Sequence, residues 1–216
     1  MLIFVKINVT MKKILFVLSI ATMLLAGVSC KKDNPAEDNS GSEKPVSAVD
    51  LGLSVYWATF DMSGEYPDGF DPGKDYFNNV WNNSYITGAW FQYINPKDKA
   101  NQKFGGRWRM PTHDEWKELI DNCNWEPIEF DSYKFLVATS KIHGHETQSI
   151  RFVKNGYRNP DNNDIQNEND GYYWSSTDAG SFGWYVARLR DGGQDFAFLN
   201  GEYLCHIRPV WDPKEK

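Results

Sequence analysis

The sequence lacks an excess of positive charge, since 23 lysine and arginine residues stand against 29 aspartate and glutamate residues, for a formal net charge of −6. An acidic chain with no basic stripe repels phosphate groups, so nucleic acid is not an expected partner. The sequence also lacks an internal repeat with a period of roughly 20 to 50 residues, which excludes a solenoid. Aromatic residues are plentiful at 15%, so the chain can bury a large core.

No hydrophobic run is long enough for a permanent membrane helix. Residues 14–28 are apolar or small, whereas a helix that spans a bilayer needs roughly 20 such residues. The run follows Met11 and two lysines and leads to Cys30, which is typical of a lipoprotein signal peptide. We expect residues 1–29 to be a signal peptide, with Met11 as a candidate true start, and Cys30 to carry acyl chains such as palmitate. Ordinary secretion with cleavage elsewhere is the alternative.

The segment after Cys30 is polar. Residues 31–47 contain no aromatic residue and almost nothing apolar, so they cannot offset the entropy cost of ordering. We expect residues 30–47 to form a lipidated cysteine with a flexible tether, and residues 48–213 to form one domain.

Two helices are predicted. Thr112 and Glu115 have the spacing of a capping box, and apolar residues recur at helical spacing behind them, so residues 113–123 should form a helix with one buried face. Pro96 can start a second, short helix that the two glycines after Phe104 end.

Strands account for much of the remaining chain. Apolar residues alternate over residues 51–57, and residues 134–138 and 149–153 flank a turn around Gly144. Asp-Gly and Asn-Gly pairs at 191–192 and 200–201 are strong hairpin signals. They predict a three-stranded meander of residues 184–189, 194–199 and 203–210. Strands before and after two short helices indicate an α+β domain with antiparallel strands and long loops.

Long loops are the candidate ligand-binding parts. Residues 161–170 are rich in the oxygen ligands that Ca²⁺ prefers, although the glycine of an EF-hand loop is missing. The candidate ligand-binding residues are Asp161, Asn163, Asp164, Asn167, Asp170 and Trp184. Trp81 and Phe182 also lie near predicted loops and can stack on a ligand. A solvated loop without a metal is the alternative, and we expect no cofactor.

Cysteine and histidine chemistry stays open. With Cys30 lipidated, Cys123 and Cys205 form either a disulfide or two buried free thiols. His143 and His145 can chelate a metal, but no third ligand stands at a recognisable spacing, so a turn is the preferred interpretation. No metal site is assigned.

Four motifs in order resemble the Fibrobacter succinogenes major paralogous domain. They are VDLGLSVYWAT at 49–59, GRWRMPT at 106–112, GYYWSS at 171–176 and IRPV at 207–210. That family is similar in fold to C-type lectin-like domains, and more distantly to formylglycine-generating enzymes. The resemblance implies a domain whose first and last strands lie together, with two helices and an irregular loop region. It also implies export or lipid anchoring, as in Bacteroidetes-type lipoproteins.

These observations predict a non-catalytic binding or adhesion module on a lipoprotein of the outer membrane, at the cell surface. Its partners would be the membrane, through the lipid, and a glycan or an extracellular protein. The expected binding face comprises residues 62–92 and 155–170, with 178–183 at its edge, because loops on a rigid scaffold commonly carry recognition. A structural fimbria- or envelope-associated component and a formylglycine-generating-like oxidase are the alternatives.

Overall fold

The computed structural model describes residues 44–62, 91–92, 98–130 and 133–213, which all belong to one structural unit, Asn39–Lys216. The predicted signal peptide, Cys30, the tether up to residue 43 and residues 63–90 of the predicted binding face lie outside the described residues. Among the described residues, no helix is long and apolar enough to cross a membrane.

The described residues form four antiparallel sheets and two short α-helices. The first sheet has the order β1 (Ala48–Val49), β2 (Tyr56–Ala58), β14 (Val210–Trp211), β4 (Trp108–Arg109). The second has the order β5 (Cys123–Phe130), β6 (Tyr133–Ser140), β7 (Ser149–Lys154). The third has the order β10 (Gly171–Asp178), β11 (Trp184–Arg190), β12 (Gly193–Leu199). The fourth has the order β3 (Phe91–Gln92), β13 (Leu204–Cys205), β8 (Tyr157–Arg158), β9 (Ile165–Gln166). The predicted α+β class is confirmed at this level.

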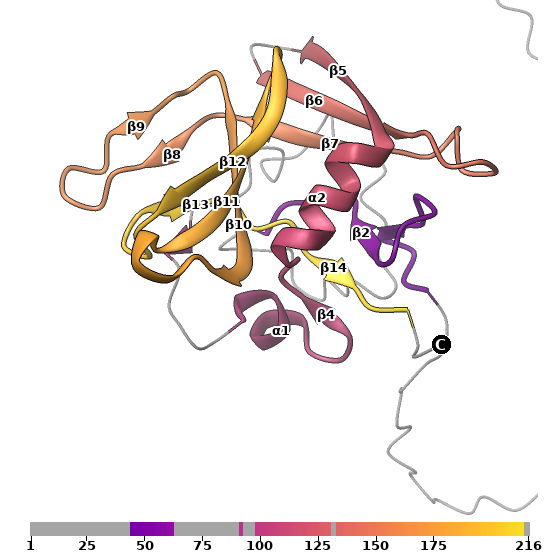
Figure 1. Cartoon of the computed structure of the whole chain (residues 1–216), viewed down its shortest axis with the longest axis horizontal. Coiled ribbons are helices and arrows are strands. Elements are labelled where there is room, and N and C mark those ends of the chain that lie inside the picture. Colours follow the sequence, from indigo (N-terminus) through magenta and orange to yellow (C-terminus); the bar gives the residue numbers. More distant parts are fainter. Residues whose placement is uncertain (1–43, 63–90, 93–97, 131–132, 214–216) are drawn as a thin grey trace, which may run out of the picture. The chain divides into compact units, whose positions relative to one another are not determined.

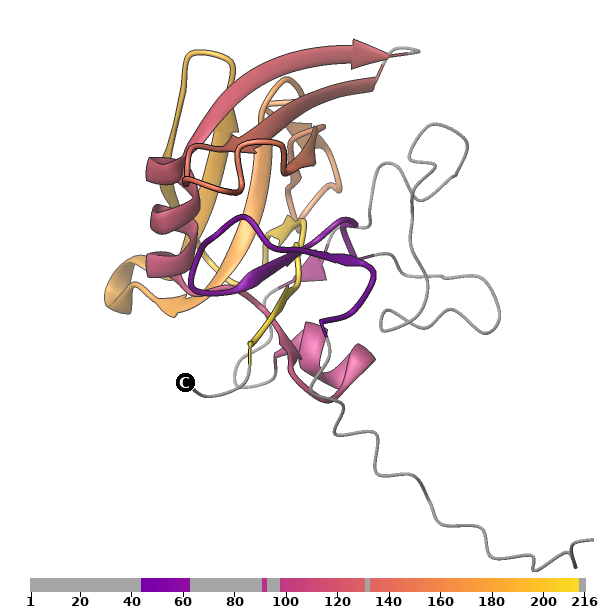
Figure 2. The same cartoon turned by 90° about the vertical axis from the view of Figure 1, so that its right-hand side faces the viewer.

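The last strand of the described chain, β14, pairs with β2, the second strand. In β14, Val210 is opposite Trp57 of β2 on one edge and opposite Arg109 of β4 on the other. Figures 1 and 2 both show β2 in indigo next to β14 in yellow. The family resemblance implied that the first and last strands lie together; in the structure β1 and β14 belong to one sheet, with β2 between them.

The helix α2 (His113–Asn122) begins where the sequence predicts. Its capping box is complete, because Thr112 and Glu115 each accept from the other's backbone N–H. The buried Trp116 and Leu119 belong to a core cluster that also draws on β2, β6, β7, β10, β11 and β14. The other helix, α1 (Lys99–Phe104), has Asp98 as its N-cap and ends at Gly105, while the predicted start at residue 96 lies outside the described residues.

The sheet β5-β6-β7 contains one strand that sequence analysis did not predict. The turn between β6 and β7 is confirmed, with Val137 opposite Arg151. However, α2 runs directly into β5, which pairs with β6 although it contains Pro127. Because β5 is at the edge of its sheet, a residue without an N–H is tolerated there.

The predicted C-terminal meander is wrong in its third strand. The hairpin of β11 and β12 closes over Asp191-Gly192 as expected, since Arg190 is opposite Gly193. The third strand of the sheet is β10, and residues 203–210 instead divide between β13 and β14 in other sheets. Residues 171–175 are all buried, so β10 has no alternating pattern that would mark it as a strand.

The predicted strand 51–57 is much shorter in the structure. Leu51, Val55 and Trp57 are buried as the alternation indicates, but regular pairing begins only at Tyr56. The backbone N–H of Gly52 donates to Asp50, and that of Ser54 donates to the carboxylate of Glu118. Because side chains take these donors, the segment bends instead of joining a ladder.

Candidate functional site

Three aromatic side chains adjoin one another on one face of the β10-β11-β12 sheet. Phe182, in the 3₁₀ turn η1 (Gly180–Phe182), is 71% exposed, and Phe198 of β12 is 49% exposed. Their ring centroids lie 5.7 Å apart, and the ring of Phe198 lies 5.1 Å from that of Tyr185. Adjoining exposed apolar side chains mark surfaces that bind other molecules. We call Phe182, Tyr185 and Phe198 the aromatic platform.

The strand register places two rings of the platform. Tyr185 of β11 is directly opposite Phe198 of β12, so both side chains leave the sheet on the same face. Phe196, two residues before Phe198, shares this face and packs partly into the main core cluster. The platform is therefore continuous with the core and rests on a rigid base.

The third ring depends on a tight turn. The carboxylate of Asp178 accepts from the N–H of Gly180 at 2.7 Å, and the N–H of Ala179 donates to the carbonyl of Gly183 at 2.8 Å. Gly183 has a φ of +95°, and a Cβ there would lie 2.4 Å from the carbonyl oxygen of Leu199. Only glycine fits this close approach, so Gly183 holds the turn that presents Phe182.

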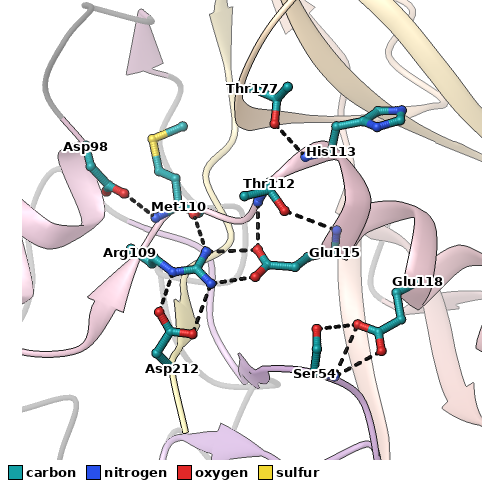
Figure 3. Close-up of polar contacts among 10 residues, drawn as sticks. All are labelled: Ser54, Asp98, Arg109, Met110, Thr112, His113, Glu115, Glu118, Thr177 and Asp212. Atoms are coloured by element: carbon teal, nitrogen blue, oxygen red, sulfur yellow. Dashed lines mark hydrogen bonds and ion pairs between the residues drawn. The ribbon is translucent and has the colours of Figure 1, made fainter. Parts of the chain in front are cut away.

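The first residue of α2 supports the platform. The His113 ring packs against two aromatic rings, with centroid distances of 4.3 Å to both Tyr185 and Phe196. Its backbone N–H donates to the Thr177 hydroxyl of β10 at 3.0 Å (Figure 3). The start of α2 is thus fastened to the sheet that carries the platform.

Arg109 fixes the same helix end to the C-terminal strand. Figure 3 shows its guanidinium between the carboxylates of Glu115 and Asp212. The hydrogen bonds to Glu115 raise the pKa of Arg109, so the guanidinium stays charged. Because Glu115 is also the capping-box residue, one network joins β4, α2 and the end of β14.

Two exposed acidic residues belong to the segments that carry or support the platform. The side chain of Asp114, adjacent to His113, is 95% exposed, and Asp178 at the base of η1 is exposed too. The basic residues of β11, Arg188 and Arg190, project from the opposite face of the sheet and pair with Asp195. The platform therefore combines apolar rings with a negative rim.

The predicted oxygen-rich loop divides into two turns. At the tip of the β8–β9 hairpin, the N–H of Asp161 donates to Asn159 and the carboxylate of Asp164 accepts from Asn162. In the same turn, Asn163 adopts a positive φ of 60°. These polar groups form their hydrogen bonds within the loop itself. Among the described residues, no group of three or more His, Cys, Asp or Glu side chains is arranged to hold a metal ion.

The second turn leads into β10. The side-chain amide of Asn167 donates to the Tyr172 hydroxyl at 2.8 Å, and the carbonyl of Asp170 accepts from the N–H of Gly156. Burial raises the pKa of Asp170. Trp184 packs, partly buried, against a second core cluster on the face opposite the platform. The structure thus places Trp184 on the other face of the sheet from the aromatic platform.

The two described cysteines are free and buried, so the candidate disulfide between them is not present. Cys123 belongs to the main core cluster, and Cys205 belongs to the second cluster with Trp174 and Val186. Burial raises the pKa of Cys123 to about 11 and raises that of Cys205 well above its usual range. Neither thiol is suited to act as a nucleophile at neutral pH.

Sequence analysis identified Phe182 as a stacking candidate but missed Tyr185, Phe198 and the supporting His113. Phe196 and Phe198 alternate within a predicted strand, which was the available signal. Alternation shows that two residues share a face, but it does not show whether that face is covered.

Comparisons with protein-family models, with curated proteins and with solved structures give no match.

Proposed function

We propose that the domain is a non-catalytic binding or adhesion module that engages a glycan or protein ligand through the aromatic platform. The observation that carries this proposal is the exposure of Phe182 and Phe198 beside each other on a well-supported sheet. Aromatic rings supply large contact area at a low entropy cost, and such residues dominate many binding surfaces.

The same proposal includes the location and the family relationship. The hydrophobic run before Cys30 supports a signal peptide and a lipid anchor, and thereby a lipoprotein at the outer-membrane surface. The pairing of β2 with β14, the two short helices and the four sequence motifs support a C-type-lectin-like domain related to the Fibrobacter major paralogous domain.

The burial of both described thiols argues against the oxidase alternative. A formylglycine-generating-like mechanism needs a redox-active thiol pair, whereas Cys123 and Cys205 are buried in different core clusters. Their raised pKa values disfavour the reactive thiolate.

The test is a screen of the purified full chain against glycan and extracellular-protein collections, repeated with calcium and with a chelator. The double variant Phe182→Ala, Phe198→Ala should weaken binding of any hit by about tenfold or more, because both rings are lost from the contact. Tyr133→Ala is the matched control, since Tyr133 is an exposed aromatic residue (40%) on β6. Equal loss in both variants, or no loss in the double variant, would contradict a role for the platform.

A further inference from the structure

The strand β12 has an open edge next to the aromatic platform. In the part of the chain that the structure describes, β12 pairs only with β11. The two-residue turn Asp191-Gly192 makes Arg190 and Gly193 a hydrogen-bonded pair, and bonded and non-bonded pairs then alternate along the hairpin. The backbone N–H and C=O groups of Gln194, Phe196 and Phe198 therefore point away from β11.

These outward groups have no hydrogen-bond partner within the described residues, whether backbone or side chain. Natural proteins usually protect such an edge with a charged residue, a proline or a bulge. Here residues 196–199 are Phe-Ala-Phe-Leu, and the register with β11 is continuous. The one charged residue in the strand, Asp195, projects from the other face and pairs with Arg188 and Arg190.

The open edge and the platform are parts of one surface. Side chains of Phe196 and Phe198 lie on the platform face, and their own backbone groups are the ones that point outward. A strand added to β12 would place its alternate side chains beside Phe198 and Phe182. An extended polypeptide can satisfy both the backbone edge and the rings, whereas a glycan cannot continue the ladder.

Charge distinguishes a foreign strand from a second copy of this chain. Asp114, which contacts the supporting His113, and Asp178, at the base of η1, are acidic and exposed, and the whole chain has a formal net charge of −6. A second copy would bring like charges together, whereas lysine or arginine side chains would meet both the carboxylates and the ring faces. We infer that β12 binds an extended, positively charged polypeptide segment by strand addition, an inference that rests on the proposed binding function and names its ligand class.

The experiment selects binders from a displayed library of random ten-residue peptides, using the full chain as bait. Selected peptides should be enriched in lysine or arginine and in β-branched residues at alternate positions. Gln194→Pro removes an outward N–H and places a ring on the edge, while Gln194→Ala loses the same side chain, including its bond to the Arg190 carbonyl, but keeps the N–H. We expect Gln194→Pro to weaken binding by about tenfold or more and Gln194→Ala by less than about threefold.

A second measurement reads the peptide backbone directly. N-methylation of every second residue of a selected peptide should abolish binding in one register and leave it intact in the other, because only one set of N–H groups faces β12. Amide exchange at Phe196 and Phe198 should slow when the peptide binds. Circular dichroism of Gln194→Pro, compared with that of the unmodified chain, checks that the fold is retained.

The outcomes separate this inference from the proposed function. Peptides that need Phe198 but bind Gln194→Pro and Gln194→Ala equally would overturn strand addition and leave the platform as the binding site. Failure to select any peptide, or selection of acidic ones, would overturn the inference while the glycan screen still tests the platform. If the unmodified chain binds no peptide, glycan or extracellular protein, that result would contradict both the strand-addition inference and the proposed function.

Discussion

Asp61 and Arg208 form a buried ion pair in the domain. Their side chains are 3% and 2% exposed, and Arg208 Nε lies 2.7 Å from Asp61 Oδ1. The guanidinium also donates to the carbonyls of Ala58 and Arg151, and the Tyr173 hydroxyl donates to Asp61. Every charge in the pair is thus matched, although both groups have been removed from water.

Breaking this pair should be costly. Arg208→Met leaves a buried carboxylate without its cation, so the free energy of unfolding should fall by about 3–5 kcal/mol. The control is Arg188→Met, which breaks a partly exposed pair with Asp195 and should cost about 1 kcal/mol or less. Urea denaturation measures both. A cost for Arg208→Met no larger than that of the control would show that the pair is dispensable.

The two buried cysteines give a second residue-scale prediction. Because burial raises the pKa of Cys123 to about 11, its thiolate is scarce at pH 8, and Cys205 is fully buried as well. Neither residue should react with iodoacetamide in the native protein, and both should react once urea unfolds it. Peptide mass mapping with and without reductant shows whether Cys123 and Cys205 are alkylated and whether they are linked. Native labelling of either thiol, or a linked peptide pair without reductant, would contradict the free, buried state.

At the scale of elements, the sequence predicts local features such as helix caps and tight hairpins correctly, but it does not predict which distant strands pair. The capping box of Thr112 and Glu115 and the Asp191-Gly192 hairpin are set by neighbours in sequence, so their patterns sufficed. The second neighbour of β11 is β10, a pairing that neighbours in sequence do not determine. Residues 171–175 of β10 are all buried, so the sequence shows no alternation of apolar and polar residues there. Two of the three platform residues, Tyr185 and Phe198, could not be predicted for the same reason, because their exposure depends on what packs on the sheet.

The turn η1 makes an element-scale prediction. Gly183→Ala would put a Cβ against the Leu199 carbonyl and strain a positive φ, so the turn must move and Phe182 with it. We expect a loss of about 1–3 kcal/mol in unfolding free energy and weaker binding at the platform. Gly192→Ala is the control, because a Cβ there meets no atom within 4 Å. Thermal unfolding and binding of a platform ligand measure both, and equal behaviour of the two variants would show that η1 tolerates a side chain.

At the scale of the whole molecule, the C-terminal strand completes the domain. This strand, β14, pairs with β2 near the other end of the described chain, and such long-range pairing has no local sequence pattern. It was expected only because four motifs resemble a known family. The structure gives the physical reason for the arrangement: β14 is central in its sheet, between β2 and β4, and Val210 is fully buried in the main core cluster. Trp211 stacks on Tyr56 and on the guanidinium of Arg107.

Removing β14 should therefore unfold the whole domain and not leave the remaining strands folded. A chain that stops after Pro209 loses the ladder to Trp57 and Arg109 and exposes Trp57 to water, so we expect no cooperative unfolding transition and rapid proteolysis. A chain that stops after Pro213 keeps β14 and the ion pair of Asp212 with Arg109, and its unfolding midpoint should equal that of the full chain. Near-ultraviolet circular dichroism during urea titration distinguishes the two. A cooperative transition at the full-chain midpoint in the shorter variant would mean that the sheet closes without its last strand.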